Sequence, residues 1–291
     1  MMKLAVFLQY IIPKQAITAL AGILANYEGG SLTTSVIGWF IKRYQVNMAE
    51  AAQPDISAYK TFNDFFTRPL KPNARPLAQV EFICPVDGAI SQFGKIDADQ
   101  IFQAKGHAYS TKALVGGDSQ LAEKFENGHF ACLYLSPKDY HRIHMPCDGT
   151  LKSMTYVPGA LFSVNPTTAQ GVPGLFARNE RVICEFVSAQ HGSFIMVLVG
   201  ATIVGSMATV WHDATNGIIN PPRSSKVRVW NYEDQNILLK QGEEMGRFLL
   251  GSTVVMLFQK DSIAFNANWR AADPIKLGEF MGKKQEFNYK L

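Results

Sequence analysis

A serine that directly follows a glycine could carry chemistry near the C-terminal end of this chain. Ser252 follows Gly251 between two apolar runs, residues 248–250 and 254–258. Glycine has no Cβ and tolerates unusual backbone angles, so the next hydroxyl can approach the preceding carbonyl and attack the peptide bond. A hairpin or bulge with ordinary turn residues would contain the same step. The remaining residues must decide between these interpretations.

A serine nucleophile needs a base, and that base works best when a carboxylate fixes its tautomer. His141 and His144 lie three residues apart, and Asp87 lies in a Pro-x-Asp-Gly turn. Asp87, one of the two histidines and Ser252 therefore supply carboxylate, base and nucleophile in chain order. Each also has a structural interpretation, as a turn former or a structural histidine pair whose rings would share a face if the segment is helical. A metal site is not favoured, because no third ligand has useful spacing.

The composition indicates a globular chain with one large domain and an appendage, or with two domains. The 291 residues are 47% hydrophobic and 18% charged, which excludes a disordered chain. A net charge of +4 fits an anionic membrane surface or substrate, and no basic run interleaved with aromatic residues indicates nucleic-acid binding. The four cysteines are scattered without metal-ligand spacing, which indicates buried free thiols and a reducing compartment.

The first part of the chain predicts two amphipathic helices, at residues 14–26 and 31–44, with Ser31 capping the second. Neither has the roughly 18 uninterrupted apolar residues that a membrane span needs. Apolar faces that include Leu24 and Trp39, with two cations at residues 42–43, are typical of helices that lie at a membrane interface. A helical hairpin packed on its own domain is the alternative.

Beyond a proline-punctuated connector at residues 69–76, the chain changes to short strand-like segments. The clearest of these are residues 130–135, 181–187, 194–204, 227–230 and 254–258. A Pro-x-Asp-Gly turn occurs at Asp87 and again at Asp148, each time before a predicted strand. The sequence therefore predicts an α+β fold: a β-rich, barrel-like or sandwich-like catalytic core in residues 77–291, and an amphipathic helical membrane-contacting segment with its connector in residues 1–76.

Several sequence blocks, taken together, resemble the phosphatidylserine decarboxylase family. They are Leu250-Gly251-Ser252-Thr253, its lead-in at residues 240–248, the histidine block at residues 139–146, and residues 62–68, 85–88 and 156–159. The blocks follow one another from about residue 62 to residue 258, and no single block carries the resemblance. Gln241 in the lead-in and Asp148 beside the histidine block depart from the family pattern, but neither touches the implied chemistry.

The resemblance implies a proenzyme that cuts itself between Gly251 and Ser252 into a large chain, residues 1–251, and a small chain, residues 252–291. His144, oriented by Asp87, would deprotonate Ser252, whose oxygen attacks the carbonyl of Gly251. Elimination from the resulting ester and hydrolysis, with loss of ammonia, would convert residue 252 into a covalent pyruvoyl group. This group, derived from Ser252, is the implied cofactor.

The implied reaction converts phosphatidylserine to phosphatidylethanolamine and CO₂ in phospholipid biosynthesis. The pyruvoyl ketone condenses with the substrate amine and accepts the electrons released as CO₂ leaves. His141 is expected to contact the substrate carboxylate and to supply a proton, because a group that titrates near neutrality suits both tasks. The spacing leaves the opposite assignment of His141 and His144 open.

The expected partners are phosphatidylserine, a membrane surface and the two chains of one precursor, without nucleic acid and with homo-oligomers left open. The expected location is the cytoplasmic face of the cell membrane, peripherally bound. Two other classes of protein compete with this interpretation. One is a non-enzymatic module on a membrane anchor, and the other is a serine peptidase or esterase, for which a separate nucleophile elbow is missing.

Overall fold

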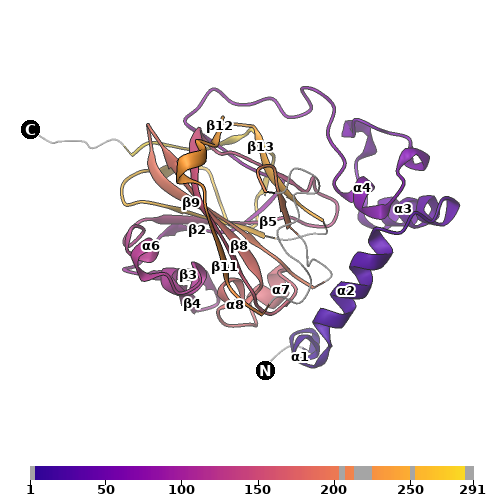
Figure 1. Ribbon diagram of the computed structural model, residues 1–291, viewed down its shortest axis with the longest axis horizontal. Helices are drawn as coiled ribbons and strands as arrows, with labels where there is room; N and C mark the ends of the chain where they lie inside the picture. Colours follow the sequence, from indigo (N-terminus) through magenta and orange to yellow (C-terminus); the bar gives the residue numbers. More distant parts are fainter. Residues whose placement is uncertain (1–3, 203–206, 213–224, 250–252, 286–291) are drawn as a thin grey trace, which may run out of the picture.

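The computed structural model describes residues 4–202, 207–212, 225–249 and 253–285 of the chain (Figure 1). Its α-helices are α1 (Leu4–Ile11), α2 (Lys14–Ala25), α3 (Ser31–Tyr44), α4 (Phe62–Phe66), α5 (Thr111–Leu114), α6 (Ser119–Glu123), α7 (Pro166–Ala169) and α8 (Leu175–Arg178). Its strands are β1 (Phe82–Ile83), β2 (Gly88–Lys95), β3 (Gln100–Ala104), β4 (His107–Ser110), β5 (His129–Tyr134), β6 (Arg142–His144), β7 (Gly149–Val157), β8 (Arg181–Ser188), β9 (Gly192–Val199), β10 (Met207–Thr209), β11 (Arg228–Asn231), β12 (Leu238–Leu239), β13 (Glu244–Phe248), β14 (Thr253–Phe258), β15 (Ala264–Phe265), β16 (Pro274–Ile275) and β17 (Phe280–Lys283).

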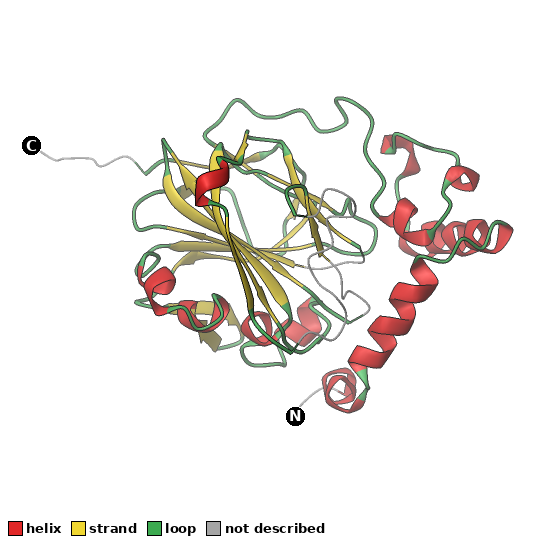
Figure 2. Ribbon diagram, viewed as in Figure 1, coloured by secondary structure: helices red, strands yellow, loops and turns green. Residues whose placement is uncertain are grey.

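Helices α1 to α4 form an arm beside a sheet-rich body, and a long loop leads from α4 to the first strand (Figures 1 and 2). The two predicted N-terminal helices are present as α2 and α3, but the predicted cap of α3 is wrong. Gly30 is the N-cap with φ 57°, a conformation that glycine tolerates, and Ser31 is already helical without a capping hydrogen bond.

Large apolar side chains on α1 to α3 face solvent rather than the protein body. Leu20, Ile23 and Leu24 on α2 are 58%, 69% and 62% exposed, and Trp39 on α3 is 60% exposed. The residues of α2 that are buried are the polar Thr18 and the small Ala25. In the part of the chain that the structure describes, no helix combines the length and the hydropathy that crossing a membrane would require.

The body is built on a sheet of nine described strands in the order β11-β7-β8-β9-β14-β5-β2-β16, with β12 also paired to β7. Strand β14 lies between β5 and β9 and pairs with both over its whole length. Because successive side chains point to opposite faces, Val254 and Met256 enter one hydrophobic core while Val255 and Leu257 enter the other. Both faces of the sheet are covered, which explains the unbroken apolar run in this strand.

The two faces of this sheet have different covers. The sheets β10-β13-β6 and β1-β17-β15 contribute to the core on one face, and the short helices α5 to α8 contribute to the core on the other. The predicted α+β class, with N-terminal helices and a sheet-rich core, is confirmed. The described strands run in an open order that ends at β11 and β16. All four cysteines are buried free thiols, as the sequence predicted.

The histidine segment is a strand rather than a helix. Residues 142–144 form β6 and pair with β13, so the condition under which His141 and His144 would share a helical face is not met. Pro146 leaves too short a segment for a stable helix. Pairing with β13 satisfies the backbone hydrogen bonds of this segment instead. The turns at Asp87 and Asp148 do lead into strands, β2 and β7.

Candidate active site

Two sheets bring the histidine block beside the residues that flank the predicted cleavage step. On the upstream side, the N–H of Phe248 at the end of β13 donates a hydrogen bond to the carbonyl of His141 at 3.0 Å. On the downstream side, Thr253 begins β14 opposite Tyr134 of β5. Gly251 and Ser252 themselves, the predicted cleavage site and source of the cofactor, lie outside the described residues.

His144 is hydrogen-bonded at both ring nitrogens. Its Nδ1 lies 2.8 Å from the carbonyl oxygen of Gly242, and its Nε2 lies 3.1 Å from the hydroxyl of Tyr140. A carbonyl oxygen can only accept, so Nδ1 carries the hydrogen and Nε2 accepts from the tyrosine. Burial lowers the pKa of His144, against the effects of the Gly242 hydrogen bond and of the charges on Glu244 and Asp87. The ring is therefore a neutral imidazole with a basic Nε2 at pH 7.

Asp87 is paired with an arginine rather than with a histidine. Its Oδ1 accepts from Nε of Arg75 at 2.9 Å and from the N–H of Leu277 at 2.9 Å, and its Oδ2 accepts from Nη2 of Arg75 at 2.5 Å. Arg75 also donates to Glu50 at 2.7 Å. Among the described residues, no hydrogen bond joins Asp87 to His144, and Asp87 acts on that ring through its charge. Their predicted union with Ser252 in one triad stays a prediction.

His141 is fully buried, with one ring nitrogen unpaired. Its Nδ1 lies 2.8 Å from the carbonyl oxygen of Asp139, and its ring centroid lies 4.1 Å from that of Phe66. Nε2 has no hydrogen-bond partner among the described residues. Burial lowers the pKa of His141 to about 3, and the charge of Arg68 acts in the same direction. The expected titration near neutrality therefore does not hold for this ring as it stands, and at pH 7 it is neutral.

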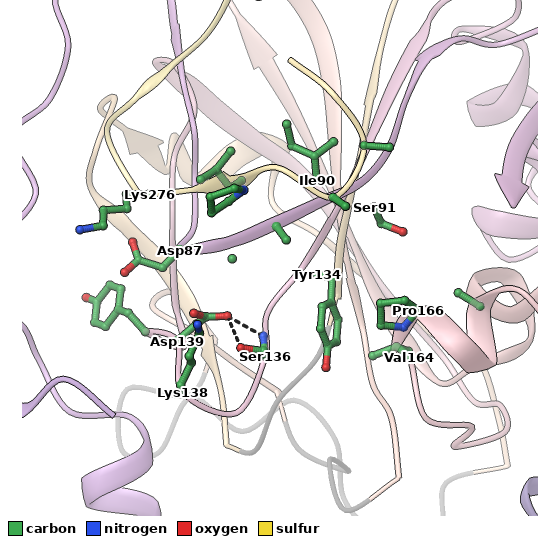
Figure 3. A pocket seen from close by; sticks show the side chains of 18 of the residues that line it. Asp87, Ile90, Ser91, Tyr134, Ser136, Lys138, Asp139, Val164, Pro166 and Lys276 are labelled. Carbon is green, nitrogen blue, oxygen red and sulfur yellow. Dashed lines mark hydrogen bonds between the residues drawn. The ribbon is translucent and has the colours of Figure 1, made fainter. Parts of the chain in front are cut away.

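A cavity of about 750 Å³ is lined by residues of the helical arm, of β2, of the segment after β5 and of α7. Figure 3 shows Asp87 and Lys276 at one end of it and Val164 and Pro166 at the other. Between them, Asp139 accepts two hydrogen bonds of 2.7 Å from the N–H and the hydroxyl of Ser136. The cavity thus has a charged end and a more apolar end, which suits an amphipathic ligand.

Two buried polar atoms lack partners among the described residues. They belong to residues beside the undescribed step, so their hydrogen-bonding needs show whether a pyruvoyl group fits there. One is Nε2 of His141 and the other is Oγ1 of Thr253, and both residues are 0% exposed. A buried polar atom without a partner is costly, so a polar group beside them would relieve that cost. The Thr253 hydroxyl can donate to a ketone oxygen. The Thr253 hydroxyl therefore fits a carbonyl-bearing group at position 252, whereas Nε2 of His141 is an acceptor, because Nδ1 carries the hydrogen toward the carbonyl of Asp139.

Sequence reasoning missed two side chains of this site, Arg75 and Tyr140. Tyr140 stands next to His141 in the histidine block, so its neighbourhood was a usable signal, but nothing in the spacing shows that its hydroxyl reaches His144. Arg75 lies in the proline-punctuated connector, where no periodic pattern links it to Asp87.

The fold and the site define a β-rich chain with an apolar helical arm and two histidines, one buried and one half-buried, that follow residues of a cavity wall. Residues 62–283 match the family model for phosphatidylserine decarboxylase, and residues 4–45 match a model described as PSD. The chain is 70% identical to a phosphatidylserine decarboxylase proenzyme of Dechloromonas aromatica (strain RCB), over 96% of this chain and 98% of that protein. Proteins of the same description from Albidiferax ferrireducens and Azoarcus sp. (strain BH72) are 67% and 65% identical over 97% and 96% of this chain, and over 98% and 96% of their own lengths. The chain belongs to the phosphatidylserine decarboxylase family.

Proposed function

We propose that this chain is the precursor of an enzyme that converts phosphatidylserine to phosphatidylethanolamine and CO₂ in phospholipid biosynthesis. The observation that carries the proposal is the 70% identity, over nearly both full lengths, to a relative that is named a phosphatidylserine decarboxylase proenzyme. The geometry supports it, because the histidine block contacts the strand that leads to the Gly251–Ser252 step. The peptidase or esterase alternative has no comparable support.

Self-cleavage occurs between Gly251 and Ser252 with His144 as the base. Its Nε2 is unprotonated and can take the proton of the Ser252 hydroxyl once Tyr140 yields that position. The carbonyl of Gly242 fixes the tautomer at Nδ1, a task that a carboxylate performs in the usual triad. Asp87 contributes its negative charge, which favours the imidazolium that forms when the proton arrives.

The cofactor of the mature enzyme is the covalent pyruvoyl group at position 252, which supplies a ketone that condenses with the substrate amine and withdraws electrons as CO₂ leaves. The Thr253 hydroxyl would donate to the ketone oxygen, and Nε2 of His141 would face the substrate. A substrate carboxylate beside Nε2 of His141 raises the pKa of that ring, because an adjacent anion favours the imidazolium. His141 can then hold a proton at Nε2 and deliver it to the substrate carbon after CO₂ has left.

The helical arm brings this site to the membrane, where the protein binds peripherally at the cytoplasmic face. The exposed apolar side chains of α1 to α3 support membrane contact over the packed hairpin, which would bury Leu20, Leu24 and Trp39. Residues directly after α3, including Glu50, line the cavity. A lipid headgroup can therefore enter while its acyl chains stay in the bilayer.

The mass of the denatured protein tests self-cleavage. We expect two chains, of 251 and 40 residues, with a blocked N-terminus on the smaller one. The Ser252→Ala variant should remain one uncut chain and release no CO₂ from phosphatidylserine vesicles. An uncut wild-type chain that still released CO₂ would exclude the pyruvoyl mechanism but not the decarboxylase activity.

Two variants test the division of roles between the histidines. His144→Ala should stay uncut, whereas His141→Ala should be cut at least partly and yet release little CO₂. Asp87→Ala should also fail to cut, and combining it with His144→Ala should cause no further loss, because groups that act as a unit are not additive. An uncut His141→Ala together with a cut His144→Ala would reverse the two roles.

A further inference from the structure

Arg68 is a buried cation in the cavity wall, and its N–H donors form long hydrogen bonds or none. It is 3% exposed and lines the cavity two residues after the end of α4. Its Nη1 and Nη2 lie 3.4 Å from the carbonyl oxygens of Phe65 and Lys138, at the long limit for a hydrogen bond. Its Nε has no partner, and among the described residues no carboxylate forms an ion pair with it.

The neighbouring carboxylates already have other partners. Asp87 and Glu50 bind Arg75, and Asp139 binds Ser136. They influence Arg68 only at longer range, and burial lowers its pKa. Two long hydrogen bonds and the ring of Phe65, 5.2 Å from the guanidinium carbon, are weak compensation for a buried charge, so an anionic ligand in the cavity would complete its interactions.

A second buried arginine shows what a purely structural guanidinium looks like in this protein. Arg181 is also 3% exposed, but it donates to the carbonyl oxygens of Leu114, Ala113 and Asn179 at 2.7, 2.7 and 2.8 Å. It does not line the cavity described above. Backbone carbonyls therefore use the donors of Arg181 within the fold, whereas the donors of Arg68 remain for an anion in the cavity.

We infer that Arg68 binds the phosphodiester of the phospholipid substrate, an inference that rests on the proposed function. The guanidinium fork matches the oxygens of a phosphate group, and such charge-assisted bonds are among the strong ones. Position supports the assignment: Arg68 follows α4 of the helical arm, and its neighbour Phe66 contacts the ring of His141. The phosphate of a headgroup lies between the lipid backbone and the reacting serine, and Arg68 directly follows the arm, two residues from the side chain that contacts the histidine.

The substrate carboxylate is the competing anion, and the chemistry argues against it. This group loses its charge as CO₂ departs, so a tight ion pair with it would stabilise the ground state more than the transition state. The phosphodiester keeps its charge throughout the reaction. Arg68 can bind it equally in substrate, transition state and product without opposing the chemical step.

Kinetics with a short-chain, water-soluble phosphatidylserine separate these two partners. Loss of an interaction that is uniform along the reaction raises KM and leaves kcat unchanged. For Arg68→Gln we expect a KM about 10- to 100-fold higher, the range that loss of a charge-assisted bond gives, with kcat within about twofold of the wild type. Arg228→Gln removes an exposed positive charge on β11, away from the cavity, and should change neither constant.

Calorimetric binding to the cleaved protein provides a readout that does not depend on turnover. Glycerophosphoethanolamine carries the amine and the phosphodiester, whereas O-methylserine carries the amine and the carboxylate. Arg68→Gln should weaken binding of the first by a similar factor and leave the second unchanged, and Arg68→Lys should fall between. A selective loss of O-methylserine binding, or a rise in kcat together with the rise in KM, would assign Arg68 to the carboxylate and overturn the inference. A fall in kcat at constant KM would show a contact made only in the transition state and would also overturn it.

Self-cleavage and the thermal midpoint report whether each variant folds. If Arg68→Gln does not fold, Arg68→Lys carries the test, since it keeps the charge and loses the fork. Equal affinity of Arg68→Lys and wild type for glycerophosphoethanolamine would then contradict phosphate binding. A wild-type protein that released no CO₂ would instead contradict the proposed function, so the two failures are distinguishable.

Discussion

The two histidines of the site differ in what satisfies their ring nitrogens. His144 has a partner at each nitrogen, the carbonyl of Gly242 and the hydroxyl of Tyr140. His141 has one, the carbonyl of Asp139, and its Nε2 is enclosed without a partner among the described residues. Both rings are therefore neutral near pH 7. His144 can accept a proton at Nε2, whereas His141 gains one only when an anion binds beside it.

The burial of His141 predicts a pH-dependent stability. Its pKa is about 3 in the folded protein, against about 6.5 in an unfolded chain. The unfolded state therefore binds more protons between these values, so the stability from this ring is complete above pH 6.5 and is lost as the pH falls toward 3. Its slope is at most about 1.4 kcal/mol per pH unit.

The Ser252→Ala protein should remain a single chain, so the slope can be measured for one unfolding species. In that background His141→Asn keeps an N–H donor but cannot titrate. Denaturant unfolding at pH 4.5 to 6.5 should show a slope smaller by about one proton in the variant. Identical slopes would show that His141 is protonated in the folded chain.

The pairing of Asp87 with Arg75 predicts a large effect of Arg75→Met. The two side chains are 9% and 8% exposed, and removal of one partner leaves the other charge buried and unpaired. We expect a loss of about 3–5 kcal/mol in the free energy of unfolding, again measured in the uncut background. Lys240→Met breaks an ion pair with Asp148 whose side chains are 60% and 40% exposed, and it should cost no more than about 1 kcal/mol. Equal losses would mean that Arg75 stabilises the fold no more than a surface cation.

At the scale of elements, the turn between β12 and β13 places the base. The carbonyl that accepts from His144 belongs to Gly242, which has φ 81° and would meet Leu77 at 2.3 Å if it carried a Cβ. The positive φ is the reason the backbone there needs glycine, because the Leu77 atom is the far end of an exposed side chain that can move aside. The turn therefore links the lead-in of the cleavage step to the tautomer of the base.

Gly242→Ala should slow self-cleavage at least tenfold, because strain at φ 81° moves the carbonyl away from Nδ1 by enough to lose a hydrogen bond worth about 1–2 kcal/mol. Gly106→Ala is the matched control. Gly106 has φ 79° in the β3–β4 turn, and a Cβ there would meet nothing within 4 Å. It should lower stability by about 1 kcal/mol and leave the cleavage rate unchanged, as followed on a denaturing gel. Equal cleavage rates in both variants would exclude the positioning role of Gly242.

The apolar surface of the arm predicts a loss of membrane binding on substitution. Changing Leu20, Ile23 and Leu24 to Gln removes about 1 kcal/mol of transfer energy or more for each side chain, which should weaken sedimentation with anionic vesicles about 100-fold. Self-cleavage should be unaffected. The matched control changes the equally exposed residues Val227, Val229 and Leu238 to Gln, and it should still bind. Unchanged binding of the arm variant would favour the packed-hairpin interpretation.

How much the sequence revealed depended on whether a feature was local. Helix α3 has the predicted bounds, and β14 begins one residue before its predicted start, because periodicity and apolar runs report burial directly. β9, predicted to reach residue 204, ends at Val199, and part of that segment lies outside the described residues. The strand at 142–144 depends on its pairing with β13, far away in the chain, which no local pattern shows.

The site residues show the same difference between features that are local in the sequence and features that depend on distant contacts. The histidine block was found from its residues, whereas the partner of Asp87 was not, because an arginine twelve positions away in an irregular connector has no periodic signature. The two departures from the family pattern, Gln241 and Asp148, lie 93 positions apart in the sequence. In the structure the N–H of Gln241 donates to Asp148 at 2.8 Å, and Lys240 pairs with the same carboxylate at 2.9 Å.

At the scale of the whole molecule, the proposed cut would separate β13 from β14 and leave the large sheet shared by two chains. Most of the small chain that the structure describes is integrated into the body: β14 pairs with β5 and β9, β16 with β2, and β17 with β1. The pairs of β14 cover six residues on each side. The small chain is therefore part of both cores and should remain bound after cleavage.

Refolding should distinguish precursor from mature protein. After dilution from denaturant, the uncut Ser252→Ala chain should recover its far-ultraviolet circular dichroism at a rate that does not depend on protein concentration. The cleaved protein should recover less of this signal, at a rate that rises with protein concentration. The small chain that carries β14 must then bind the large chain as a separate molecule. Concentration-independent recovery of both would mean that β14 is dispensable for assembly of the sheet.

The central position of β14 has a consequence for the lifetime of the enzyme. Before the cut, the chain itself supplies the effective concentration that closes the sheet, and after it that advantage is gone. The mature protein then persists through a high barrier to unfolding rather than through repeated folding, which is kinetic stability. Because the turn at Gly242 meets His144 only once β13 has paired with β6, cleavage would also mark the chains in which this pairing has formed, and the mark cannot be undone.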